Sequence, residues 1–243
     1  MGKISQYTTS TSIVEGDLFP FTALANMTTY KAEWSTIKSM LGITDGWTPI
    51  NSTLYYISAN SFYIAGDWTS KINIRDKIKF TQTNPKYFIV TAVSYSSPNT
   101  TFTVMAGTTY TVANAGITLP YFSHGLSPVG FPASFAYTPT ITATSGTFTS
   151  VSATGIFSAV GRRVDFKYAI TITTNGTAAG AVVATMPISP TATCIIPGRE
   201  NTATGKMLQG IVSTGGGMNI YDYSGAYPGG DGRSLIVSGS YFI

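Results

Sequence analysis

The 243-residue sequence has very few of the residue types on which most protein chemistry depends. It contains one cysteine, one histidine, 14 lysines and arginines and 10 aspartates and glutamates, so 10% of its residues are charged, against about 25% in a typical soluble chain. A single cysteine excludes an intrachain disulfide framework and a cysteine-based metal site, and His124 cannot complete a metal-ligand set by itself. We therefore expect neither a metal ion nor a cofactor.

Catalytic motifs are also missing. No G-x-S-x-G elbow accompanies His124, and the Gly215-Gly216-Gly217 run lacks the strand-to-helix setting and the following lysine of a phosphate-binding loop. In the C-terminal part of the chain, the acids available in loops for a glycoside-hydrolase pair are Glu200, Asp222 and Asp231. The sequence predicts a protein that is not an enzyme, with a carbohydrate-active enzyme or its binding module as an alternative.

Charge and hydropathy limit the partners as well. No run of 18 apolar residues and no basic-then-apolar leader occurs, so we expect neither membrane insertion nor a signal peptide. The net charge of +4 comes from scattered residues, of which only Arg162 and Arg163 are adjacent, so we expect no nucleic-acid partner. Because a monomer with so few charges covers its surface poorly, part of that surface is expected to be an interface between identical subunits.

What the sequence has in abundance is β-forming residues, most clearly in its last hundred positions. The stretch from Arg163 to Thr173 alternates, with apolar side chains on one face at Val164, Phe166, Tyr168, Ile170 and Ile172. Further strands are predicted at 147–154 and 156–160, and Asn175-Gly176 is the strongest turn signal. Eight or nine strands in about 110 residues favour a β-sandwich of the jelly-roll type.

The preceding segment, residues 46–121, predicts a small β-domain with turns at Asn84-Pro85 and Ser97-Pro98-Asn99. Its strongest strand, Lys86–Tyr95, is apolar on both faces, which indicates a central strand. Residues 122–139 hold repeated Pro and Gly and are interpreted as an ordered linker. The sandwich head then occupies residues 140–243.

Residues 1–45 form a short N-terminal segment that cannot bury a core alone. A Thr-rich extended stretch at 4–13 is followed by a turn and by an apolar run, and Tyr30 to Trp34 alternates as a strand does. Ser35 is a good N-cap for a small helix at Thr36–Leu41, which Gly42 would end. The whole chain is thus predicted to be all-β apart from this one helix.

Two polar, aromatic loops of the head are the candidate binding site. The segment from Tyr221 to Arg233 combines three tyrosine rings with acids and an arginine, and Arg199-Glu200-Asn201 is a second loop of similar character. Flat aromatic faces beside hydrogen-bonding groups suit sugar rings, although tyrosines in such loops also pack against the sandwich or between subunits. The candidate residues are Arg199, Glu200, Tyr221, Asp222, Tyr223, Tyr227, Asp231 and Arg233.

Short motifs throughout the chain resemble the tail-fibre or receptor-binding proteins of tailed bacteriophages and prophages. In the head they are Gly155-Ile156-Phe157, Val160 to Val164, Gly176 to Gly180, Met186-Pro187 and Val237 to Tyr241. The run Ser127 to Pro132 and the block Lys79 to Val93 are similar to the connector and β-domain of small phage fibres. The N-terminal run from Ile4 to the Ser35-capped helix is similar to the segment that anchors such fibres to the virion. Its anchor residues would be Leu18, Phe19, Phe21, Tyr30, Trp34, Ile37 and Leu41.

The resemblance implies a homotrimer whose N-terminus docks on tail or baseplate proteins and whose head binds a host surface glycan or protein. It also implies a virion protein that is made in the host cytoplasm and released by lysis. Because no long shaft is present, the fibre would be a short spike. The alternative is a purely structural collar, baseplate or capsid-decoration protein.

Overall fold

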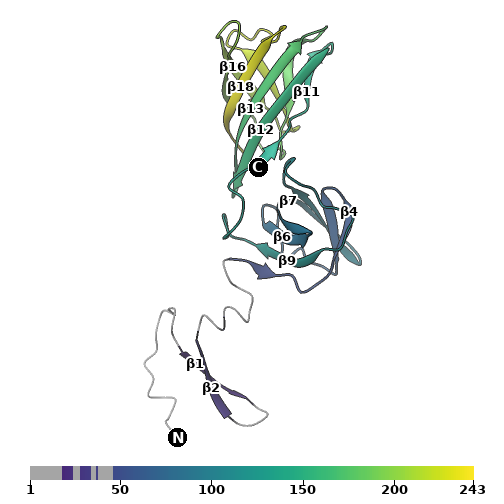
Figure 1. The fold of residues 1–243 in the computed structure, drawn as a ribbon, viewed down its shortest axis with the longest axis vertical. Helices are drawn as coiled ribbons and strands as arrows, with labels where there is room; N and C mark the ends of the chain where they lie inside the picture. The colour runs from purple at the N-terminus through teal and green to yellow at the C-terminus, as the bar shows by residue number, and fades with distance from the viewer. Residues whose placement is uncertain (1–17, 24–27, 34–36, 38–45) are drawn as a thin grey trace.

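The computed structural model describes residues 18–23, 28–33, 37 and 46–243. Their strands form sheets of two, seven and nine strands, and every pairing is antiparallel (Figure 1). Within this described part of the chain, no helix is both long and apolar enough to cross a bilayer. The all-β, sandwich-like fold class is confirmed.

In the N-terminal segment the structure describes a hairpin of β1 (Leu18–Ala23) and β2 (Thr28–Glu33), in which Phe21 lies opposite Tyr30. The strand expected from Tyr30 is therefore present up to Glu33. The stretch at 4–13, Trp34, and the predicted helix at 36–41 apart from Ile37 lie outside the described residues.

The seven-stranded sheet is a curled sheet built around phenylalanines. Phe62 and Phe80 come from strands separated by two others in the sheet, yet their ring centroids lie 6.0 Å apart across the interior. Such contact requires the sheet to fold back on itself. In spatial order the strands are β3 (Thr48–Pro49), β9 (Thr118–Ser123), β6 (Lys77–Gln82), β7 (Asn84–Ser96), β8 (Asn99–Met105), β5 (Ser61–Ala65) and β4 (Leu54–Ser58).

The position of β7 confirms the prediction of a central strand. It pairs with β6 on one side and β8 on the other, and the consecutive residues Phe88 and Ile89, which face opposite sides, are both buried. The turn predicted at Asn84-Pro85 is wrong by one residue, because the chain reverses at Thr83, which has a φ of 60°. Pro85 is tolerated in β7 because β8 pairs with that strand only from Ile89 onward.

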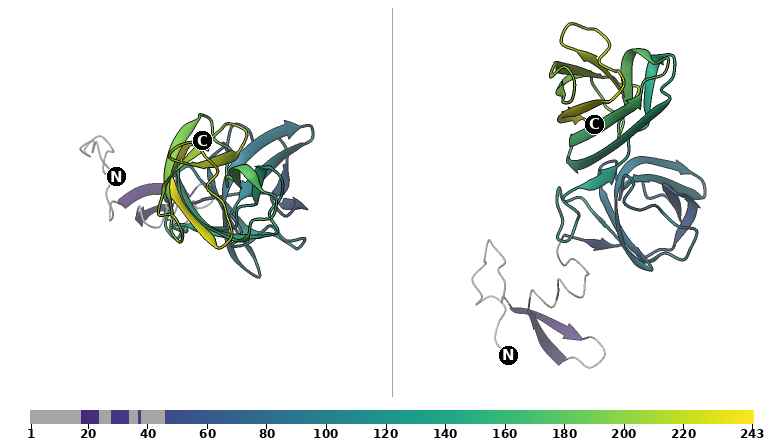
Figure 2. Two further views of the ribbon diagram at one scale, coloured as in Figure 1. Left: turned by 90° about the horizontal axis from the view of Figure 1, so that it is seen from above. Right: turned by 45° about the horizontal axis from the view of Figure 1, so that its top comes forward.

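The nine-stranded sheet, the head, also curls until its halves face each other across one core (Figure 2). The hydroxyl of Tyr168 in β13 donates to the Thr185 carbonyl of β14 at 3.3 Å, although four strands separate β13 from β14 in the sheet. In spatial order the strands are β10 (Phe135–Tyr137), β12 (Ser150–Val160), β13 (Arg163–Thr174), β18 (Arg233–Phe242), β15 (Cys194–Glu200), β16 (Met207–Val212), β17 (Gly217–Asp222), β14 (Ala179–Thr185) and β11 (Ile141–Ser145).

Strand β13 buries the face that its alternation predicts, since Val164, Phe166, Tyr168, Ile170 and Ile172 are all buried. The two strands predicted at 147–154 and 156–160 are instead one strand, β12, and the break expected at Gly155 is wrong. A Cβ at Gly155 would lie 2.4 Å from the Tyr168 ring, so this glycine makes room for the ring within a continuous strand.

Aromatic rings join the two sheets into one continuous core. Phe135 of β10 stacks on Phe157 at 5.5 Å and contacts Tyr110 and Phe131 edge-on at 6.4 and 5.6 Å. The Thr108 amide donates to the Ala136 carbonyl at 2.8 Å, in the segment that the sequence marked as a linker. A Cβ on Gly107 would lie 2.0 Å from that carbonyl oxygen, so the segments around Gly107 and Ala136 are in close backbone contact. The predicted linker thus contains the end of β9 and all of β10, while the domain limits themselves stay a prediction.

Candidate functional site: the loop tip of the head

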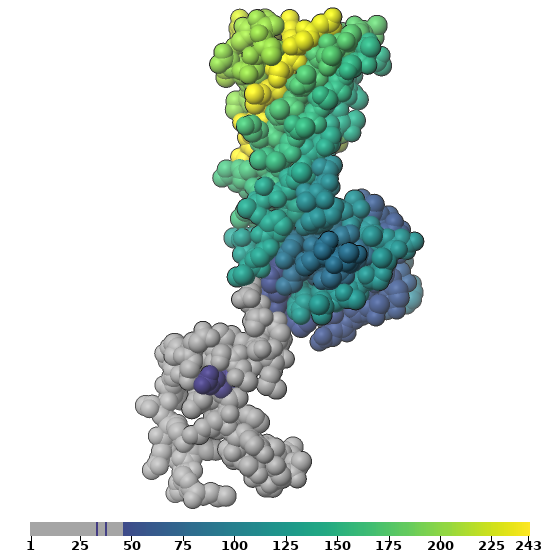
Figure 3. Space-filling model, in the orientation of Figure 1, coloured from purple at the N-terminus to yellow at the C-terminus, as the bar shows by residue number. Residues whose placement is uncertain are grey.

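Three loops meet at the end of the head that points away from the seven-stranded sheet, and we call this end the tip. They are the β13–β14 turn (175–178), the β15–β16 loop (201–206) and the β17–β18 loop (223–232). The β11–β12 loop (146–149) lies beside the β13–β14 turn, where the Thr177 amide donates to the Thr147 carbonyl at 3.1 Å. Antiparallel pairing brings the three loops together, because it sets Glu200 opposite Leu235 and Asp222 opposite Leu208. In Figure 3 the green and yellow residues at the top build this surface.

The β15–β16 loop folds around the carboxylate of Glu200, which is buried although three of the next five residues are polar. This carboxylate accepts bonds from the amides of Thr202, Ala203 and Gly205 and from the hydroxyls of Thr202 and Thr204 at 2.7–3.2 Å, and from the Thr204 amide. Burial opposes the charge, but these hydrogen bonds outweigh it and hold the pKa of Glu200 well below its usual value of 4.5.

Asp222 has the same role at the start of the β17–β18 loop. Its buried carboxylate accepts bonds from the Ser224 amide and hydroxyl and from the Ala226 amide at 2.6–2.9 Å. Lys206 donates to its second oxygen at 2.8 Å and thereby ties the two loops together. The bonds from Lys206 and Ser224 hold the pKa of Asp222 well below its ordinary value of 3.8.

Asn175 attaches the third loop. Its side-chain Oδ1 accepts from the Tyr227 hydroxyl at 2.6 Å, and its side-chain Nδ2 donates to the Ala178 carbonyl. Its backbone amide donates to the Asp231 carboxylate at 2.6 Å. Arg233 points back into its own loop and donates to the Pro228 carbonyl at 2.8 Å. The tip is therefore a braced surface in which most polar side chains already have partners within the chain.

Of the predicted candidates, Tyr223 is the most available for a ligand, since 68% of it is exposed. The Lys206 ammonium lies 5.7 Å from the centre of its ring, and Met207 is exposed beside it. Arg199 and Asp231 are also exposed, and Tyr221 and Tyr227 are half-buried. By contrast, Glu200 and Asp222 lie beneath the loops, where they support the surface and do not form it.

Sequence reasoning missed three residues of this site: Lys206, Met207 and Asn175. Lys206 was recognisable as a cation next to a polar loop, but its partner Asp222 is 16 residues away. Asn175 was identified only as a turn residue, while its side chain also joins two loops 52 residues apart in sequence. Both contacts depend on strand order, which the alternation of residues does not specify.

The two buried carboxylates of the tip are not suited to act as a general acid. A glycosidase acid needs a raised pKa, whereas the pKa values of Glu200 and Asp222 are lowered and their oxygens are occupied by hydrogen bonds. His124 lies far along the chain from these acids and pairs with Asp76 at 2.9 Å, with its side chain 58% exposed. The described residues contain no group of three or more His, Cys, Asp and Glu side chains suited to a metal ion.

A scan against family models finds no match to the chain, and searches of curated proteins and of solved structures also find none.

Proposed function

We propose that this chain is a short tail fibre or spike protein of a tailed bacteriophage or prophage, which binds a host cell-surface glycan with its tip. The observation that carries the proposal is the convergence of three braced loops at the tip, the end of the head that lies far from residue 46 (Figure 1). Exposed aromatic and cationic side chains on a rigid β-scaffold are a common arrangement for recognition. Residues 1–45 would attach the protein to the tail or baseplate.

The proposal includes a homotrimer. The outer face of the head carries exposed apolar side chains at Ile156 and Val160 of β12, Phe242 of β18 and Ile195 of β15. Two shallow hollows of about 160 and 340 Å³ flank Ile156. Exposed apolar side chains next to hollows on a chain with so little charge support burial of this face against copies of the same protein.

The finer assignment of the head as a jelly roll belongs to the same proposal. The curled nine-stranded sheet, with its two halves facing each other, supports it. An experimental structure that follows the chain through both halves of the head would test whether the connections are those of two Greek keys.

The function is tested with the purified, fluorescently labelled chain on intact bacterial cells, with its mass measured by light scattering in the same sample. We expect a trimer that binds saturably and that loses at least tenfold in affinity when Tyr223→Ala removes the exposed ring, about 1.4 kcal/mol or more. Tyr95→Ala removes an exposed tyrosine of β7 and serves as the matched control. Equal binding of the two variants would contradict the tip assignment.

A purely structural virion component is the second candidate. It is favoured by the extent to which Glu200, Asp222, Tyr227 and Arg233 bond within the chain, which leaves few polar groups of the tip for a receptor. It predicts the same trimer without saturable binding to any cell.

A further inference from the structure

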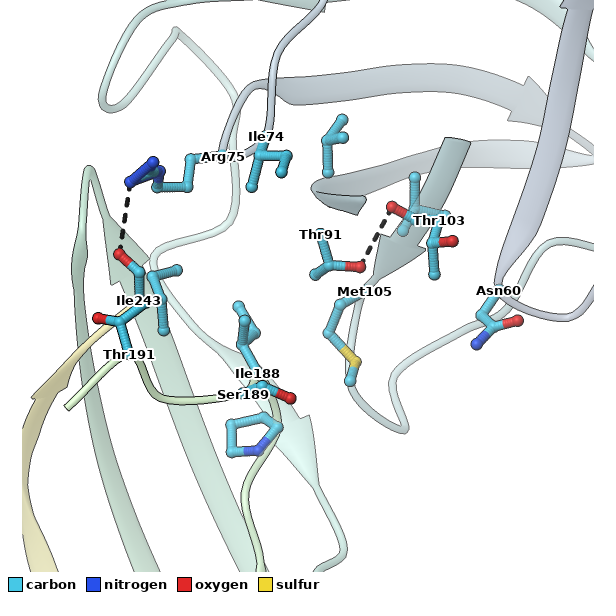
Figure 4. Close-up of a pocket in the computed structure, with 13 residues that line it drawn as sticks. Asn60, Ile74, Arg75, Thr91, Thr103, Met105, Ile188, Ser189, Thr191 and Ile243 are labelled. Carbon is cyan, nitrogen blue, oxygen red and sulfur yellow. Dashed lines mark hydrogen bonds between the residues drawn. The ribbon is translucent and has the colours of Figure 1, made fainter. Parts of the chain in front are cut away.

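A second concave site lies between the seven-stranded sheet and the head, away from the tip (Figure 4). This junction groove encloses about 440 Å³, within the usual range of ligand pockets of about 300–1,000 Å³. One wall is formed by β7 and β8, and the other by the segment 187–191 and Ile243. Apolar side chains line much of it: Ile74, Val90, Val104, Met105, Ile188 and Ile243.

Polar groups at the rim are available to a ligand. The Thr103 and Ser189 hydroxyls and the Asn60 Nδ2 have no hydrogen-bond partner among the described residues, and each lines the groove. Apolar walls with hydroxyl and amide donors at the rim suit a sugar ring, which presents C–H faces and a rim of oxygens.

Arg75 places a positively charged side chain at the groove. It has a φ of 80°, an uncommon conformation for a residue other than glycine, and strain of this kind is concentrated at functional sites. Its Nη1 donates to the Ile243 carbonyl at 3.4 Å (Figure 4). Among the described residues, no Asp or Glu side chain forms an ion pair with its guanidinium. No acidic side chain lines the groove at all.

A second hollow on the other side of Arg75 is also lined by positively charged side chains. This smaller hollow of about 160 Å³ shares Arg75 and is lined by the cationic side chains of Lys77 and Arg162, with Asp76 as its only acidic side chain. Asp76 is occupied by His124 at 2.9 Å and by the Asn73 amide at 2.7 Å. Arg75 and Arg162 both donate to the Ile243 main-chain oxygen at 3.4 Å, and the side chains of the junction carry more positive than negative charge, which favours an anionic ligand.

We propose that the junction groove binds an acidic saccharide unit, with the sugar ring against the apolar walls and its carboxylate on Arg75. Arginine is suited to this role because its fork of N–H donors matches the two oxygens of a carboxylate. The inference rests on the proposed function only for the class of ligand, a saccharide. The junction groove is separate from the tip, because Tyr223 is not among the residues that line it.

The test titrates the purified full chain with methyl glucuronide, the neutral methyl glucoside and inorganic phosphate, followed by calorimetry or NMR. We expect the glucuronide to bind at least about tenfold more tightly than either of the other probes. Arg75→Asn, which keeps a residue tolerant of positive φ and removes the guanidinium, should weaken glucuronide binding about tenfold or more. Lys71→Gln removes one exposed positive charge elsewhere and should change nothing.

A second variant guards against a loss of structure. Thr103→Trp fills the groove from β8 and should abolish glucuronide binding while the spectrum of the rest of the chain is kept. Equal affinity for glucuronide and glucoside, or equal effects of Arg75→Asn and Lys71→Gln, would overturn the inference. Phosphate binding as tight as that of glucuronide would also overturn it, because the site would then recognise a free anion. Tyr223→Ala should leave glucuronide binding intact, so failure at the tip and failure at the groove are distinguishable.

Discussion

At the tip of the head, loops fold around two buried carboxylates, whereas at the junction with the seven-stranded sheet the contacts are mainly between aromatic rings. Glu200 and Asp222 are held by hydrogen bonds to nearby amides and hydroxyls, while Phe135 and Phe157 are held by stacking and burial. The tip can therefore keep a polar outer surface without a core of its own. The junction fixes the direction in which that surface points.

The two regions should respond to different perturbations. Hydrogen bonds to a carboxylate fail when the carboxylate is protonated, whereas ring packing is insensitive to pH and fails when volume is removed. Three variants, taken from the largest expected effect to the smallest, separate the two regions.

Phe157→Ala should be the most damaging change. It removes a buried ring that stacks on Phe135 and touches Tyr137 edge-on at 6.1 Å, which leaves a cavity in the shared core. We expect the free energy of unfolding to fall by about 3–5 kcal/mol, measured by urea denaturation at fixed protein concentration. Tyr95→Ala, which removes an exposed ring of β7, is the control. A loss below about 1 kcal/mol would mean that ring packing does not hold the junction.

Glu200→Gln should affect the tip alone. The amide cannot accept from all the donors that face the carboxylate, so some are left unpaired and stability should fall by about 2 kcal/mol. Hydrogen exchange should accelerate at residues 202–205 and stay unchanged at the junction. Asp165→Asn replaces a surface acid of β13 outside the tip and is the control.

The pH dependence of stability of the Glu200→Gln variant also distinguishes the tip from the junction. Because the folded pKa values of Glu200 and Asp222 are below their ordinary values of 4.5 and 3.8, the unfolded chain binds more protons in acid. Their stabilisation is complete above about pH 4.5 and is lost as pH falls through the folded values. Glu200→Gln should therefore flatten the acid limb of the stability profile, and an unchanged limb would contradict the role given to this carboxylate.

The smallest effect on stability is expected for Lys77→Met, at the junction. The buried ammonium of Lys77 donates to the Ala159 carbonyl at 3.3 Å, and burial lowers its pKa from 10.5 to about 8, against a smaller opposing effect of Asp76. Between pH 8 and 10.5 the unfolded chain then holds the proton that the folded chain has lost, so stability should rise with pH. Lys77→Met should remove that rise, while Lys71→Gln should keep it. The free energy of unfolding of the parent chain and of both variants, measured between pH 8 and 10.5, tests this expectation. A rise that persists in Lys77→Met would contradict it.

Much of the fold was predictable because strands bury one face. The alternation from Arg163 to Thr173 predicted the inner residues of β13, and the doubly apolar run around Phe88 predicted a central strand. Gly155 misled the prediction because a glycine in a strand indicates either a break or a close approach, and only the Tyr168 ring decides between them. Strand β10 was missed because three residues between prolines carry too little periodicity.

The candidate site was predictable in part, for a similar reason. Composition identified the loops around Tyr223 and Glu200, since aromatic and polar residues concentrate there. It could not separate Tyr223, which is exposed, from Asp222, its immediate neighbour, which is buried. Neighbouring residues in a sequence share a composition but not an environment.

The sequence by itself determined that the described part of this protein is all-β, which residues of its main strands face inward, and that the chain holds few histidines, cysteines and charged residues. These properties follow from local alternation and from residue types that no folding can change. Only the tertiary structure decided the order of strands, the meeting of three loops at one tip and the placement of Arg75 beside an apolar groove. These depend on contacts between residues far apart in the chain, such as Asn175 with Tyr227 and Lys77 with Ala159, which pattern alone does not fix.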